Sequence, residues 1–206
     1  MKAALALLLL LTASAQAQSP RHLIYLHGRI IQEQQSARPK HAEHGYYELD
    51  AIKDTLRKRG FVVHAEIRPK TTTVSSGADA VVEQVRGLIQ SGVPAKHITV
   101  AGASMGAAIA MRVAVRLREP DVRFVFLSPC ISTNFPAVMK EEGAPPVGHL
   151  LVIREESDIP TKDCPPWTGT PQARELVIDT GLRHGFLYRP LPEWVEPVVQ
   201  WANGDE

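Results

Sequence analysis

The chain has 206 residues, of which 44% are hydrophobic and 22% are charged. This composition is that of a globular domain, and it excludes a disordered tail, a collagen-like rod and a coiled coil. The 23 Lys and Arg residues are balanced by 22 Asp and Glu residues, so no basic surplus is available for phosphates and no nucleic acid partner is expected.

The first residues have the pattern of a secretory signal peptide. Lys2 supplies a positive charge, a continuous apolar run follows, and Ala15 and Ala17 place small residues where a signal peptidase cuts. The run is shorter than the roughly 20 residues that a membrane-spanning helix needs. We therefore expect residues 1–17 to be removed from a secreted or periplasmic protein. The remaining residues, 18–206, are expected to form a single domain with no membrane span.

Short apolar runs and helix-like segments then alternate along the chain. Six runs are too short for helices and are largely continuous, as in strands that are covered on both faces. The predicted strands are residues 23–26, 61–67, 98–101, 124–127, 150–153 and 176–178. Four helices are predicted. The first begins at Leu49 and ends before Gly60, the second surrounds Val81 to Leu88, the third spans residues 105–117, and the fourth surrounds Trp194 to Trp201. Pro197 is expected in the first turn of the last helix.

This alternation predicts the fold class. Strands that alternate with helices form a parallel sheet with helices on both faces. We therefore predict an α/β fold with a mostly parallel six-stranded sheet. In such sheets, ligands bind beyond the carboxyl ends of the strands, so the residues that follow each strand are the candidates for chemistry.

The third predicted strand is followed by Gly102-Ala103-Ser104-Met105-Gly106 and then directly by a helix. The pattern G-x-S-x-G between a strand and a helix is typical of a nucleophile elbow, in which a sharp turn lifts the serine hydroxyl above the sheet. A Cβ atom at either glycine is expected to collide with the neighbouring strand and helix. The alternative is that the serine merely caps the helix.

With these flanks the sequence resembles the α/β-hydrolase family, over nearly all of the mature chain. The family's order of nucleophile, acid and histidine implies that Ser104, Asp158 and His184 form a catalytic triad. Serine is a weak nucleophile, so the histidine takes its proton while the acid holds the imidazole in the correct tautomer.

The identity of the acid stays open at this point. Asp158, Asp163 and Asp179 all lie between Ser104 and the histidine, and Glu155 and Glu156 are further candidates on the turn of Asp158. Asp158 is favoured because it lies where the resembled family most often places its acid, and Asp179 is the alternative.

The first predicted strand is followed by His27-Gly28-Arg29, which resembles the family's H-G-x loop. The resemblance implies that the backbone N–H groups of Arg29 and Met105 form an oxyanion hole, and that Gly28 lets the backbone approach the substrate. His27 is expected to brace this loop rather than to catalyse.

Two departures from the larger family members are expected. Too little chain precedes the first strand for an N-terminal hairpin. The connections over residues 132–148 and 159–172 are too short for a cap domain. The resemblance therefore implies a minimal fold with an open site, as in small secreted esterases and lipases.

Cys130 and Cys164 follow the fourth and fifth predicted strands, which should be neighbours in the sheet. Because the protein is expected to be secreted, we predict a disulfide between them. Two free thiols or a metal-binding pair are the alternatives.

The connection over residues 29–45 is long for its place, and it is expected to be a solvated loop. A metal site at His41 and His44 would need further ligands, so no metal is expected. Arg29 and Arg68 follow the first two strands and could bind an acidic group of a substrate. The alternative is that Arg68 pairs with Glu33 or Glu66.

These features predict a secreted serine hydrolase that cleaves carboxylic esters through an acyl-enzyme and needs no cofactor. Its expected partner is a small-molecule or acyl-ester substrate. An acyl-peptide hydrolase or lipase-like activity on the same triad, and an inactive binding module with a hydrolase fold, are the alternatives. The sequence leaves open the acyl and alcohol parts, the preference for ester or amide, and the oligomeric state, with which a monomer is compatible.

Overall fold

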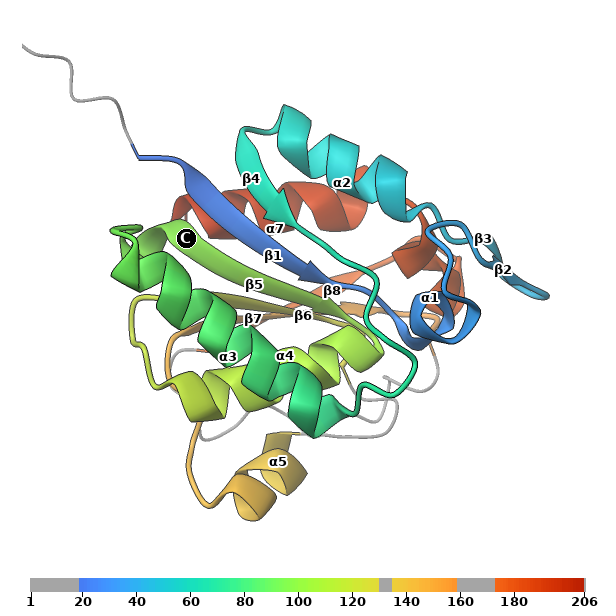
Figure 1. The fold of residues 1–206 in the computed structure, drawn as a ribbon. Helices are drawn as coiled ribbons and strands as arrows, with labels where there is room; N and C mark the ends of the chain where they lie inside the picture. Colours follow the sequence, from blue (N-terminus) through green and yellow to red (C-terminus); the bar gives the residue numbers. More distant parts are fainter. Residues whose placement is uncertain (1–18, 130–134, 159–172, 206) are drawn as a thin grey trace, which may run out of the picture.

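A computed structural model of the chain describes residues 19–129, 135–158 and 173–205. A six-stranded sheet with the order β4-β1-β5-β6-β7-β8 forms its centre, and all five strand pairings are parallel (Figure 1). The strands of this sheet are β1 Arg21–Leu26, β4 Phe61–His64, β5 Ile98–Ala103, β6 Arg123–Leu127, β7 His149–Glu155 and β8 Ala173–Ile178. The predicted α/β fold and its parallel six-stranded sheet are confirmed.

Helices cover both faces of the sheet (Figure 1). The α-helices are α1 Arg29–Gln34, α2 Leu49–Lys58, α3 Val74–Gln90, α4 Met105–Leu117, α5 Phe135–Glu142 and α7 Pro192–Asn203. The described residues also form two short 3-10 helices, η1 Ala95–His97 and η2 Arg183–Tyr188, and a hairpin of β2 Lys40–His41 and β3 Gly45–Tyr46. Among the helices formed by these residues, none is long and apolar enough to cross a bilayer.

The core consists of two layers because successive side chains of a strand point to opposite faces. Leu23 and Tyr25 of β1 pack with α2 and α7 on one face. Ile24 and Leu26 pack with α3 and α4 on the other. This explains why the strand sequences are continuously apolar rather than alternating.

Several local expectations were wrong. The last helix begins at Pro192, so Pro197 lies in its second turn rather than its first, and the ring removes the bond that an N–H there would make to the Glu193 carbonyl. The second predicted strand, residues 61–67, corresponds to β4 and ends at His64, because the segment that follows leaves the sheet to pack against the residues after β1. The helices α1 and α5 and the β2–β3 hairpin were not predicted.

The predicted signal peptide, Cys130 and Cys164 lie outside the described residues. The first described strand, β1, pairs in parallel with β4 on one side and with β5 on the other. One of the two connections considered for a cap, residues 159–172, also lies outside the described part of the chain.

Candidate active site

Ser104 lies in the tight turn between β5 and α4. Its backbone dihedral angles are φ 55° and ψ −116°, which a residue with a side chain rarely adopts. Its N–H donates to the Leu127 carbonyl on β6 at 2.9 Å, and its own carbonyl accepts from Ala107 and Ala108 at 2.9 and 3.2 Å. The strained turn predicted from G-x-S-x-G is therefore present and is held from β6 and from α4.

The two glycines of this turn allow α4 to approach the sheet. A Cβ on Gly102 would lie 2.2 Å from the carbonyl oxygen of Gly106, and a Cβ on Gly106 would lie 1.9 Å from the carbonyl oxygen of Leu26 on β1. Both distances are far below van der Waals contact with backbone that cannot move independently. The predicted collisions are confirmed, and the spacing of the motif follows from packing.

We expect Gly106→Ala to destabilise the protein strongly, because the new methyl group must push α4 away from β1. Thermal unfolding followed by circular dichroism measures the effect. Gly87→Ala is the matched control, since Gly87 lies inside α3 and its Cβ would meet nothing within 4 Å. It should stabilise the protein by roughly 0.5–1 kcal/mol. Equal melting temperatures for Gly106→Ala and wild type would contradict the close approach.

His184 and Asp158 form a hydrogen-bonded pair at the ends of β7 and β8. His184 Nδ1 lies 2.8 Å from Asp158 Oδ2. The Asp158 side chain is 1% exposed, whereas that of His184 is 20% exposed. Burial raises the pKa of Asp158, but the bonds from His184 and Ser128 outweigh it and leave this pKa below its ordinary value. The carboxylate is therefore ionised at neutral pH and holds one ring nitrogen of a histidine whose other edge is accessible.

The other candidates for the acid lie elsewhere. Asp179 follows β8 directly and is exposed, and among the described residues no hydrogen bond joins it to His184. Glu156 is also exposed, and Glu155 is buried but bonds to neighbouring loops rather than to the imidazole. Asp163 lies outside the described residues. The geometry thus favours Asp158 over Asp179.

Ser128, which the sequence did not single out, lies beside this pair. It follows β6, is fully buried, and adopts a positive φ of 51°. Its hydroxyl donates to Asp158 Oδ2 and lies 3.3 Å from His184 Nδ1. Ser128 therefore fixes the carboxylate from the strand that lies between those of Ser104 and Asp158.

Two helix N-termini lie at the site. Arg29 is the first residue of α1 and Met105 the first of α4, so neither backbone N–H has a partner inside its helix. Gly28 precedes α1 in an extended conformation, and a Cβ there would lie 3.8 Å from the Cβ of Ser104. The loop after β1 thus passes beside Ser104, where amides can face a carbonyl oxygen.

No protein-family model and no curated protein matches the sequence. The structure is similar to a hyperthermophilic esterase from Pyrobaculum calidifontis (TM-score 0.56, 18% identity, 91% of this chain and 77% of that chain). It is also similar to an esterase from Pyrococcus furiosus (0.57, 19%, 90% and 82%) and to a serine hydrolase without a lid from Xanthomonas campestris (0.54, 18%, 91% and 83%).

The chain has the α/β-hydrolase fold. At these identities the likeness is one of fold. It extends over 90–91% of this chain in the three structures named above.

Within this α/β-hydrolase fold, Arg68 does not take the place that the sequence suggested. Its Nη2 donates to the His27 carbonyl at 2.6 Å, its Nε to Gln32 Oε1 at 3.1 Å, and its backbone N–H to His27 Nε2 at 3.2 Å. It lines a cavity of about 260 Å³ beside α3, not the cavity that contains Ser104. Within the described residues, no ion pair joins it to Glu33 or Glu66, the predicted alternatives.

His27 braces the same loop, as expected. It is fully buried, and its Nδ1 lies 2.8 Å from the Gly28 carbonyl. Burial and the neighbouring Arg68 lower the pKa of His27 to about 4, so the ring is neutral at physiological pH. With Nε2 accepting from the Arg68 amide, Nδ1 carries the proton and donates it to Gly28. The side chains of His27 and Arg68 together hold the H-G-x loop in place.

We expect Arg68→Ala to change KM and kcat by equal factors for acidic and for neutral esters, because its guanidinium supports the loop and does not line the cavity of Ser104. Its melting temperature should fall, since the His27 carbonyl loses a charge-assisted bond. Arg29→Ala is the companion variant, because Arg29 does line that cavity. A selective rise in KM for acidic esters in Arg68→Ala would contradict the bracing role.

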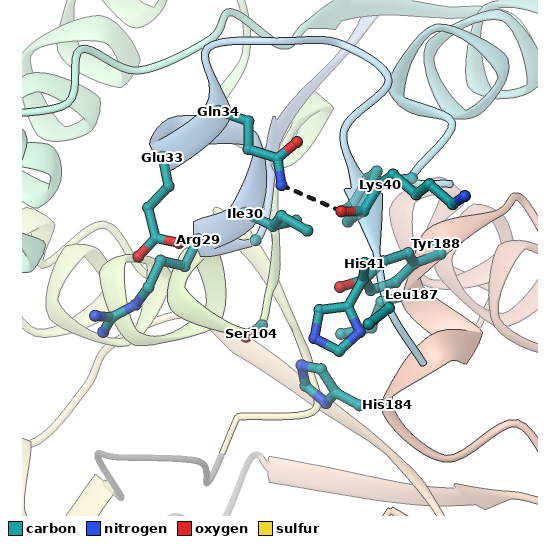
Figure 2. A pocket seen from close by; sticks show the side chains of 13 residues that line it. Arg29, Ile30, Glu33, Gln34, Lys40, His41, Ser104, His184, Leu187 and Tyr188 are labelled. Carbon is teal, nitrogen blue, oxygen red and sulfur yellow. Dashed lines mark hydrogen bonds between the residues drawn. The ribbon is translucent and has the colours of Figure 1, made fainter. Parts of the chain in front are cut away.

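A cavity of about 490 Å³ lies in front of Ser104 and His184 (Figure 2). Figure 2 shows the ring of His184 and Ser104 turned toward this same space. Helix α1 forms one wall and the β2–β3 hairpin another, joined by Gln34 Nε2 donating to the Lys40 carbonyl at 3.2 Å. The further lining residues are Gly28, Arg29, Ile30, Glu33, His41, Ala42, Tyr47, Leu187 and Tyr188. The cavity therefore has an apolar interior and a charged rim.

The hairpin replaces the predicted solvated loop. His41 Nδ1 accepts from the backbone N–H groups of Glu43 and His44 at 3.2 and 3.3 Å, and the two histidine rings stack at 4.6 Å. His44 also packs on Tyr188, with ring centroids 5.4 Å apart. Among the residues that the structure describes, no group of three His, Cys, Asp or Glu side chains could hold a metal ion. Of these two histidines, His41 lines the cavity.

Proposed function

We propose that this protein is a serine hydrolase that cleaves carboxylic esters through an acyl-enzyme. One observation carries the proposal. The serine of a strained elbow and a histidine line the same cavity, and a buried carboxylate holds the far nitrogen of that histidine. The named esterases that share the fold support an ester substrate.

The proposed reaction begins at Ser104. Because His184 Nδ1 donates to Asp158, its Nε2 presents a lone pair that accepts the serine proton. Ser104 Oγ bonds to the ester carbonyl carbon, and the carbonyl oxygen becomes an oxyanion that accepts from the N–H groups of Arg29 and Met105. Each such donor typically contributes about 3–4 kcal/mol to the transition state.

The second half returns the enzyme to its starting state. The tetrahedral intermediate expels the alkoxide, which leaves as an alcohol with the proton from His184 Nε2, and the acyl group stays on Ser104 Oγ. Water then gives a proton to His184 and attacks the acyl carbon. Collapse releases the carboxylic acid, and the proton returns to Ser104.

Labelling with a fluorophosphonate probe tests the proposal directly, because the probe reacts with an activated serine. Wild type should be labelled stoichiometrically, and Ser104→Ala should not be labelled. Ser91→Ala, which removes an exposed hydroxyl at the end of α3, is the control and should be labelled like wild type. A panel of acyl p-nitrophenyl esters should then identify the acyl preference. Folded wild type that is neither labelled nor active would instead indicate a binding module.

The proposal also includes export and removal of residues 1–17. Expression of the full sequence in a host with a general secretory pathway, followed by N-terminal sequencing of the exported protein, tests this. The expected first residue is Gln18. An exported form that still begins at Met1 would contradict the proposed cleavage.

The pH dependence should have a single acidic limb. kcat/KM should fall on the acid side, where the imidazole that accepts the serine proton becomes protonated and loses its lone pair. At neutral and mildly acidic pH, Asp158, with its lowered pKa, stays ionised, and His27, with a pKa of about 4, stays neutral. His41→Gln and His44→Gln should keep the limb. A profile that is flat down to pH 5 would exclude His184 as the general base.

A further inference from the structure

Glu155 is a buried carboxylate that the proposed triad does not use. It is the last residue of β7 and is 0% exposed. Among the described residues, no cation forms an ion pair with it. A carboxylate in such a place loses its hydration and needs strong hydrogen bonds instead.

Its two oxygen atoms bond to two different loops. Oε2 accepts from the N–H and the hydroxyl of Ser157 at 2.8 and 2.7 Å, on the turn that carries Asp158. Oε1 accepts from the N–H and the hydroxyl of Thr180 at 3.0 and 3.1 Å and from the N–H of Gly181 at 3.0 Å, on the loop that carries His184. One side chain thus receives five hydrogen bonds from both loops.

Two further hydrogen bonds connect Glu155 and Ser157 to Asp158 and to the residue before His184. The N–H of Asp158 donates to the Glu155 carbonyl at 3.1 Å, which closes the turn of the acid. The N–H of Arg183, directly before His184, donates to the Ser157 hydroxyl at 3.2 Å. Ser157 is therefore shared between the acid turn and the histidine loop.

The position of β8 explains why the histidine loop needs the hydrogen bonds to Glu155. In the described sheet β8 is the last strand, paired only with β7, where Ile178 lies beside Glu155. The loop from β8 to His184 consequently has no second strand to support it. Burial raises the pKa of Glu155, yet the bonds from Ser157 and Thr180 outweigh it and lower this pKa overall. The carboxylate is therefore ionised and accepts through both oxygens.

We propose that Glu155 is a positioning residue that fixes the acid turn and the histidine loop relative to each other, and so sets the alignment of Asp158 with His184. The inference rests on the proposed function. Displacements of about 1 Å in a catalytic arrangement can cost on the order of a hundredfold in rate. Glu155 acts through this alignment and does not touch the substrate.

Glu155→Gln tests the inference, because it keeps the shape and replaces one accepting oxygen with an NH2 group that faces N–H donors. We expect kcat to fall by roughly tenfold to a hundredfold with little change in KM. Glu156→Gln is the matched control, since it removes the adjacent, exposed carboxylate. It should retain wild-type kcat. If Glu155→Gln does not fold, Thr180→Val removes one of the same bonds, and it should show a smaller loss of the same kind.

A double-mutant cycle separates positioning from general destabilisation. In an Asp158→Asn background the pair is already impaired, so Glu155→Gln should cost less than about twofold more. Losses that multiply fully in the double variant would overturn the inference, as would a Glu155→Gln enzyme with wild-type kcat. Wild-type labelling at Ser104 in the same experiment shows whether the proposed function holds. Absence of that labelling refutes the function itself.

Discussion

His184→Ala should lower kcat for a p-nitrophenyl ester by about 10⁵-fold or more, the scale on which serine hydrolases lose rate when the base is removed. Without the imidazole of His184, Ser104 loses the proposed acceptor of its proton, and its hydroxyl is a poor nucleophile at neutral pH. Substrate binding should change less, because the apolar interior and the amides of Arg29 and Met105 remain. Steady-state kinetics at matched protein folding measures both quantities.

His41→Gln is the matched control for this variant, because His41 lines the same cavity. Its ring accepts hydrogen bonds from the backbone of the hairpin, so we expect a change in KM and a kcat within a few fold of wild type. An enzyme with His184→Ala that keeps more than a tenth of its kcat would show that the proton of Ser104 goes elsewhere.

The sequence predicted best those parts of the site that are encoded locally. The elbow of Ser104 needs two glycines at fixed spacing, because α4 can only then approach β1 and β5, and this requirement is visible in five consecutive residues. The parallel sheet was predictable for a similar reason. Strands with side chains buried on both faces have continuous apolar sequences. Such runs can be recognised in the sequence without knowing which distant residues they contact.

The parts that were missed depend on contacts between strand ends that are far apart in the chain. Ser128 is 30 residues from Asp158 and 56 residues from His184, and no local pattern marks it. Glu155 was considered only as an alternative acid, because its bonds to the histidine loop span 25 and 26 residues. The position of Arg68 was predicted from the end of the strand expected over residues 61–67, but in the structure this strand already ends at His64.

The choice between acids shows the same limit. Chain order allowed Asp158 and Asp179 equally, and Asp179 is closer to His184 in sequence. The structure separates them by burial, since Asp158 is enclosed beside Ser128 while Asp179 faces solvent. A hydrogen bond from imidazole to carboxylate is stronger where water is excluded, so the buried residue is the one that can orient the ring.

Asp158→Asn should lower kcat by about 10²-fold to 10⁴-fold while the fold stays intact. An asparagine can turn its NH2 group toward His184 Nδ1, which then must accept. The imidazole proton moves to Nε2, and the lone pair that Ser104 needs is lost. Because the carboxylate charge is also lost, the imidazolium formed during attack is no longer stabilised. Both effects act on the chemical step, so kcat should fall more than KM rises.

Asp179→Asn provides the matched control, because it makes the same chemical change on the other candidate, which is exposed and sits five residues before His184. Its kcat should stay within a few fold of wild type. Because Ser128 donates to Asp158 Oδ2, Ser128→Ala should give an intermediate loss, as the carboxylate keeps its charge but loses the hydrogen bond from Ser128. All three variants should be compared at matched melting temperatures. The reverse order, with Asp179→Asn the most impaired, would assign the acid to Asp179 and leave the buried Asp158 as a structural carboxylate.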